Sequence, residues 1–156
     1  MDSDAQLDRA ASGPRWLAQP DLARMVAEAL RYGETIRNWY CMHAWVVMPN
    51  HVHAVTIPQH AFSEIMRWLQ WTTARRAHQR LGRTGIPFWQ DASYDHWIRD
   101  QHDFARIVGY VEFNPVAAGL VECAEQWPWS SARERMDAHD QRQATRSPAP
   151  PGPPDM

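Results

Sequence analysis

The chain has 156 residues, of which 44% are hydrophobic, and its formal net charge is −2. This length favours one domain, and no stretch approaches the roughly 20 consecutive apolar residues that a membrane span requires. The acidic start 1–4 has no signal-peptide core, and Cys41 and Cys123 are the only cysteines, so we expect a cytoplasmic protein without membrane contact or a disulfide framework.

The first half of the chain predicts a helix followed by two strands. Residues 1–14 are expected to be disordered. Pro20-Asp21 offers a helix start, and apolar residues follow at amphipathic spacing, which predicts a helix over 21–37. The run 39–47 is rich in β-branched and aromatic residues and predicts a strand. A turn at Pro49-Asn50 then leads to a second strand over 51–57.

Two histidines in the second strand are the first candidates for chemistry. His51 and His53 are two residues apart, so their side chains project from one face of the strand while Val52 points into the other layer. Two imidazoles on a rigid strand supply half of a divalent-metal site. A third ligand must come from elsewhere, and the alternative is a half-exposed strand with two solvated histidines.

A run without acidic residues follows the strands. Ser63 is a candidate N-cap for a helix that reaches Leu81, and Gly82 suits its end. All basic residues of the chain are arginines, and five of them gather here: Arg67, Arg75, Arg76, Arg80 and Arg83. Such a patch can bind phosphate, but an ordinary solvated helix face would explain the same run of arginines equally well. Trp68, Trp71 and Trp89 either stack on bases or pack in the core.

The second half predicts short strands and further helices. Segments 88–90 and 94–99 are candidates for short strands or extended segments, and Asp100 can cap a helix from Gln101. Tyr110 and Asn114 are four residues apart and share a face of this helix. Pro115 predicts that the helix ends or bends there, with Asn114 capping a new turn.

The order of elements predicts an α+β fold, an antiparallel sheet with helices packed on one face. We expect one domain over 15–136 and a disordered polar and Pro-rich tail over 137–156.

The motifs themselves resemble a known family. Residues 48–53, Met-Pro-Asn-His-Val-His, and residues 110–121, which begin Tyr-Val-Glu-Phe-Asn-Pro, closely resemble the REP-associated tyrosine transposases of the single-tyrosine HUH (IS200-like) superfamily. Segments 88–91, 94–100 and 127–131 match the same pattern in the same order. The resemblance covers roughly residues 13–133 and implies a ferredoxin/RRM-like HUH fold.

The resemblance also implies an activity. His51 and His53 would bind Mg²⁺ or Mn²⁺, and Tyr110 would be the nucleophile. Asn114 would complete the metal site, although the N-cap role explains it without a metal. Tyr110 would attack single-stranded DNA at hairpin-forming repeats and form a 5′-phosphotyrosine. Tyr94 is a rival nucleophile, but it has no Asn four residues later.

One departure from the family keeps alternatives open. Full-length relatives carry a first strand beside the histidine strand, and no strand candidate precedes Asp21 here. A homodimer would be one way to cover the edge that this leaves. A catalytically inactive, truncated hairpin-DNA-binding protein is the main alternative function. A Zn²⁺ hydrolase using His51 and His53 is less favoured, because the chain has no His-Glu-x-x-His motif.

Overall fold

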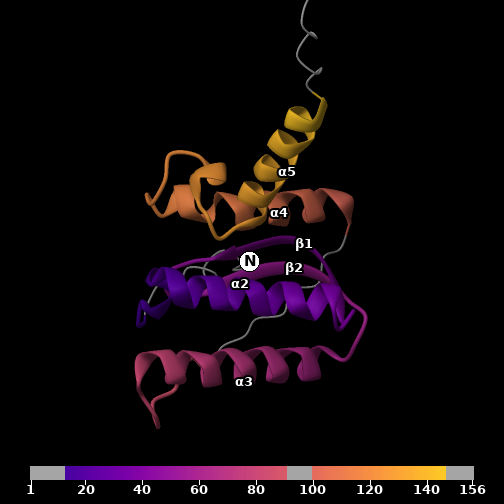
Figure 1. Ribbon diagram of the computed structural model, residues 1–156. Helices are drawn as coiled ribbons and strands as arrows, with labels where there is room; N and C mark the ends of the chain where they lie inside the picture. The colour runs from indigo at the N-terminus through magenta and orange to yellow at the C-terminus, as the bar shows by residue number, and fades with distance from the viewer. Residues whose placement is uncertain (1–12, 91–99, 147–156) are drawn as a thin grey trace, which may run out of the picture.

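Two strands lie between two helical layers in the computed structural model, which describes residues 13–90 and 100–146. The elements are η2 (Trp16–Ala18), α2 (Pro20–Thr35), β1 (Tyr40–Val47), β2 (Val52–Pro58), α3 (Phe62–Leu81), α4 (Gln101–Ala117), η3 (Ala124–Gln126) and α5 (Ser131–Arg146). Helices α4 and α5 lie on one side of the strands and α2 on the other, with α3 outside α2 (Figure 1). None of the helices described is long and apolar enough to cross a bilayer.

The strands β1 and β2 form the expected antiparallel hairpin. Their register pairs Tyr40 with Pro58 at one end and Val47 with Val52 at the other, with an irregularity between Met42 and Ala44. The Met48 amide donates to the His51 carbonyl over 2.8 Å and closes the Pro49-Asn50 turn. The predicted strand pair and turn are therefore confirmed.

The helices cover both faces of the hairpin, which corrects the expectation that they pack on one face. Trp45 and Val47 belong to the core against α2, whereas Val46 belongs to a second core against α4. The physical reason is visible in the uniformly apolar run 44–48, because a strand buried on both faces loses the alternation of polar and apolar residues. The α+β class with an antiparallel pair of strands is confirmed.

The edge of β1 that faces away from β2 is covered by the connector before α5. The Val47 amide donates to the Trp129 carbonyl over 2.9 Å, and Val46 forms an antiparallel bridge with Ser130. No described strand lies beside the other edge of β2. Segment 88–90 forms no strand, so the strand alternative predicted for it is wrong, and 94–99 lies outside the described residues.

The ends of the helices follow the sequence in part. The Asp100 carboxylate accepts a hydrogen bond from the Asp103 amide over 2.8 Å and caps α4 as predicted, and Gly82 ends α3 with a φ of 61°. The capping role predicted for Ser63 is wrong, because α3 begins one residue earlier, without a side-chain cap. Residues 137–146, which we expected in the disordered tail, are helical because α5 continues to Arg146, and 147–156 lie outside the described residues.

Candidate active site

The histidine pair lies at the turn end of β2, on the face covered by α4. His53 pairs with Val46 of β1, and the ring centroids of His51 and His53 are 4.7 Å apart with an interplanar angle of 78°. Val52 between them packs against the core on the α2 side. The predicted common face is confirmed, and both histidines are partly buried, so the alternative of two solvated side chains is wrong.

Asn50 fixes the orientation of the first imidazole. His51 Nδ1 donates a hydrogen bond to Asn50 Oδ1 over 2.7 Å. The proton of the neutral ring is therefore on Nδ1, and the lone pair is on Nε2. A hydrogen bond of this kind, behind a histidine ligand, orients the ring and makes Nε2 a better donor to a metal. From the sequence we assigned Asn50 only to the turn; its position directly before His51 was the available signal.

His53 carries a buried nitrogen, Nε2, without a hydrogen-bond partner among the described residues. Burial lowers the pKa of His53 to about 4, with a further contribution from the neighbouring His51 charge, and burial also lowers the pKa of His51. Both rings are therefore neutral near pH 7. Neutral imidazoles are the form that binds divalent metals, so these residues fit a cation.

Helix α4 places an aromatic hydroxyl next to this pair. The Tyr110 ring meets the His53 ring edge to face, at a centroid distance of 6.0 Å and an angle of 77°. Tyr110 is partly buried, and neighbouring residues of α4, including Ile107 and Val111, pack on the strands. The structure therefore brings together residues that are 57 positions apart in the sequence (110 minus 53), as the nucleophile assignment requires.

Asn114 follows Tyr110 by one turn of the same helix. Helix α4 continues through Pro115 to Ala117, so the predicted helix end at Asn114 and its N-cap role are wrong. Pro115 lies two residues before the end of α4 and is buried, so packing compensates for the single hydrogen bond that it removes. Asn114 is partly buried, and its role as a metal ligand stays a prediction.

The type of any third ligand is restricted. Among residues 13–90 and 100–146, no three His, Cys, Asp or Glu side chains gather as a metal site would require. This disfavours the Zn²⁺ hydrolase, which needs such a set. Among the described residues this leaves an amide oxygen such as that of Asn114, or else an oxygen of the bound substrate, as the third donor.

The arginine patch is not at the histidines. All five predicted arginines are exposed. Helix α3, which carries four of them, packs on α2, on the other side of the strands from α4 (Figure 1). Arg83, just beyond α3, lies 4.7 Å from the Trp16 ring centroid. The structure therefore separates the predicted phosphate-binding surface from the predicted catalytic residues.

The three tryptophans near the patch have different environments. Trp71 is 60% exposed, and the Arg75 guanidinium lies 5.3 Å from its ring centroid. Trp68 belongs to an aromatic group with Tyr32 and Trp39. Trp89 packs against the α2-side core and donates through Nε1 to Thr73 Oγ1 over 2.8 Å. Only Trp71 offers an open ring face, whereas Trp89 is a packing residue.

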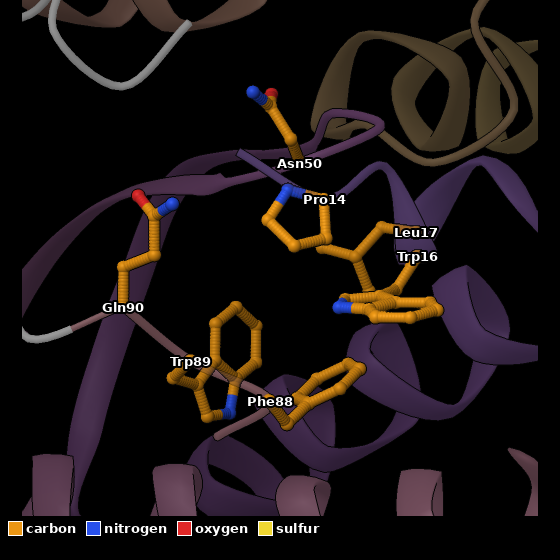
Figure 2. Close-up of a pocket in the computed structure, with 7 residues that line it drawn as sticks. All are labelled: Pro14, Trp16, Leu17, Asn50, Phe88, Trp89 and Gln90. Carbon is orange, nitrogen blue, oxygen red and sulfur yellow. The ribbon is translucent and has the colours of Figure 1, made fainter. Parts of the chain in front are cut away.

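A small pocket lies beside the turn that carries His51 (Figure 2). It is lined by Pro14, Trp16, Leu17, Asn50, Phe88, Trp89 and Gln90. Figure 2 shows the rings of Trp16, Phe88 and Trp89 around the hollow, while the Asn50 amide points away from them. The Leu17 amide donates to the Pro49 carbonyl over 2.9 Å, so η2 also supports the turn from behind.

Acid should destabilise the metal-free protein through His53. Its pKa of about 4 lies below the unfolded value of 6.5, so the unfolded chain binds more protons between these values and stability falls as the pH drops. We expect the free energy of unfolding to decrease by about 2 kcal/mol between pH 7 and pH 5 from this residue. Urea unfolding at both pH values measures this change in the free energy of unfolding.

The variant His53→Leu should lose most of that pH dependence, whereas His102→Leu, which changes an exposed histidine of α4, should keep it. An equal pH dependence in His53→Leu and the unchanged protein would contradict the assignment.

Comparisons with known proteins agree with this geometry. The family model described as "Transposase IS200 like" matches residues 20–114. A REP-associated tyrosine transposase of Escherichia coli K12 is 32% identical over 91 residues, which are 58% of this chain and 53% of the relative. A putative REP-associated tyrosine transposase of Haemophilus influenzae Rd is 42% identical over 53 residues, 34% of this chain and 29% of the relative. The matches therefore span about half or less of these relatives.

A solved structure is similar over most of the chain. It is described as a REP-associated tyrosine transposase bound to a REP hairpin, and it superposes with a TM-score of 0.63 at 24% identity. The match covers 81% of this chain and 73% of that one. At this identity the likeness concerns the fold, and it confirms the fold expected from the motifs.

Proposed function

This chain belongs to the transposase IS200-like family, and from that membership we propose that it nicks and rejoins single-stranded DNA at hairpin-forming repeats. One observation carries the proposal: the Tyr110 ring lies 6.0 Å from the ring of His53, whose Nε2 is buried without a partner among the described residues. This arrangement places a nucleophilic hydroxyl beside residues that can hold a metal, and a metal there would polarise the phosphate under attack. The solved relative, bound to a REP hairpin, supports hairpin DNA as the substrate.

The proposed reaction gives the histidines and Asn114 a metal-binding role and Tyr110 the role of nucleophile. A divalent cation, when bound, would neutralise charge on the scissile phosphate. His51 and His53 would hold that cation through their Nε2 lone pairs, with the Asn114 amide oxygen as the proposed third ligand. The Tyr110 hydroxyl must lose its proton as it attacks, because the phenolate is a stronger nucleophile than the phenol.

The attack forms a bond between the Tyr110 oxygen and phosphorus, and the bond from phosphorus to the 3′-oxygen breaks. The products are a 5′-phosphotyrosine and a free 3′-hydroxyl. The covalent link conserves the phosphoester, so a 3′-hydroxyl can attack it later without ATP. Incubation of labelled REP-type hairpin DNA with Mn²⁺, followed by denaturing gels, tests the proposal through a protein-linked DNA band.

An inactive hairpin-DNA-binding protein is the second candidate. The outer edge of β2 has no described strand beside it, and an incomplete sheet would leave the histidine strand less rigid. This function predicts a gel shift of hairpin DNA without cleavage under Mg²⁺ or Mn²⁺. The protein-linked band therefore separates the two functions.

The exposed face of α3 should contribute to DNA affinity through phosphates. Arg67, Trp71 and Arg75 are spaced by four, so they form a stripe along one face of α3, and all are exposed. We expect Arg67→Gln with Arg75→Gln to weaken hairpin binding and to reduce the slope of log affinity against log salt by about 2. Fluorescence anisotropy at several salt concentrations measures that slope.

The matched control changes two exposed arginines at the far end of α5, Arg142→Gln with Arg146→Gln. It removes the same charge from another surface. If both pairs changed the salt slope equally, the effect would be one of net charge, and the α3 surface would not be the binding site.

A further inference from the structure

A carboxylate on α4 is buried against the first turns of α5. Glu112 is 9% exposed and lies two residues after Tyr110. Ser131 Oγ donates to its Oε1 over 2.6 Å, and the Arg135 guanidinium binds both of its oxygens. The hydrogen bond to Glu112 also raises the pKa of Arg135. A carboxylate held by a bidentate arginine and a hydroxyl has a strongly preferred orientation.

The Ser131 hydroxyl also connects the Glu112 contact to strand β1. Ser131 Oγ accepts a hydrogen bond from the Trp45 amide of β1 over 3.0 Å. Ser131 is buried, at the point where the connector before α5 runs along the edge of β1 that faces away from β2. Helix α4, helix α5 and strand β1 therefore meet at three side chains, Glu112, Ser131 and Arg135, which we call the clamp.

The clamp adds directional hydrogen bonds to the contacts of α4. The core contacts of α4 with the strands are apolar, through residues such as Ile107 and Val111. The hydrophobic effect is non-directional, whereas the hydrogen bonds of Glu112 depend on the angle at which α4 presents its side chain. Residues two apart on a helix point about 200° away from each other. A rotation that broke the Glu112 contacts would therefore swing Tyr110 relative to His53.

We propose that Glu112, held by Ser131 and Arg135, is a positioning residue that sets the rotation of α4 and so the distance between Tyr110 and the histidine pair. The family match ends at residue 114, so two of the three clamp residues lie beyond it. The expected effect of the clamp on cleavage rests on the proposed function, whereas its effect on the position of Tyr110 does not. The segment after the matched region would thus help to assemble the site.

Nuclear magnetic resonance of the His53 ring tests the geometry without any need for activity. The test variant is Glu112→Met with Arg135→Met, because replacing both members of the ion pair leaves no charge unpaired at the buried end, where Glu112 lies. The matched control is Arg133→Met with Asp137→Met, which removes an ion pair of 3.0 Å within α5 that does not touch α4. Tyr110→Ala calibrates how far the His53 signals move when the neighbouring ring is removed.

We expect the His53 signals to move in the test variant, toward their position in Tyr110→Ala, and to stay in place in the control. Unchanged His53 signals in the folded test variant would overturn the clamp. If the double variant does not fold, the single variant Arg135→Lys takes its place. It keeps the charge, loses the bidentate geometry and should move the signals less.

Cleavage gives the second measurement. With saturating hairpin DNA and Mn²⁺, the test variant should nick about 100-fold more slowly, because an error of 1 Å in placing a nucleophile has an effect of that size. Its hairpin affinity should stay close to that of the unchanged protein. A loss of rate that follows the unfolded fraction would indicate a merely structural role. If the unchanged protein makes no covalent adduct, the proposed function fails. The His53 signals still show whether the clamp positions Tyr110.

Discussion

Tyr110→Phe should abolish the covalent protein–DNA adduct and reduce hairpin nicking by at least about a thousandfold, because the attacking oxygen is removed outright. Phe retains the ring that meets His53 at 6.0 Å, so the packing of α4 on the strands should not change. Hairpin affinity should therefore remain within a few-fold of the unchanged protein. Denaturing gels with Mn²⁺ measure the adduct, and anisotropy with the same DNA measures the affinity.

Tyr32→Phe is the matched control, since it removes the same hydroxyl from a residue that is 48% exposed on α2. It should leave the adduct unaffected. An adduct that persists in Tyr110→Phe would show that another residue attacks. Tyr94 would then be the first residue to replace; it lies outside the described residues, so the structure does not place it relative to His53.

The histidine face could be predicted from the sequence because the rule behind it is local. Alternation along a strand places His51 and His53 together whatever surrounds the strand, and the ring distance of 4.7 Å agrees. Pro115 shows the limit of such rules. Its local preference for ending a helix is overridden by burial against the core, so α4 continues and Asn114 is helical.

Two other features depend on partners that are distant in the chain, and sequence rules did not place them. The clamp joins Glu112 to Arg135, and nothing within a few residues of either one signals the other. The sequence shows that arginines gather on α3, but it does not show in which layer of the fold α3 packs. Charge patterning thus identified a candidate phosphate-binding helix, while its distance from the catalytic residues depends on tertiary packing.

His53→Leu should separate the function of this residue from its effect on stability. An unsatisfied buried nitrogen is costly, so an apolar side chain of similar length should raise the free energy of unfolding of the metal-free protein by about 1 kcal/mol at pH 7. The same change removes a proposed metal ligand, so Mn²⁺ binding and Mn²⁺-dependent nicking should fall by at least about a hundredfold. Calorimetric titration with Mn²⁺ alone and urea unfolding measure the two effects.

His43→Leu is the control on the same face of the sheet, where the His43 ring contacts Phe104 and is exposed. It should change neither Mn²⁺ binding nor nicking. A His53→Leu protein that was less stable and still bound Mn²⁺ would mark His53 as an ordinary packing residue. Gain of stability with loss of metal binding is the opposite pattern. It is expected when a polar atom is kept in the interior for a ligand that the folded protein alone does not supply.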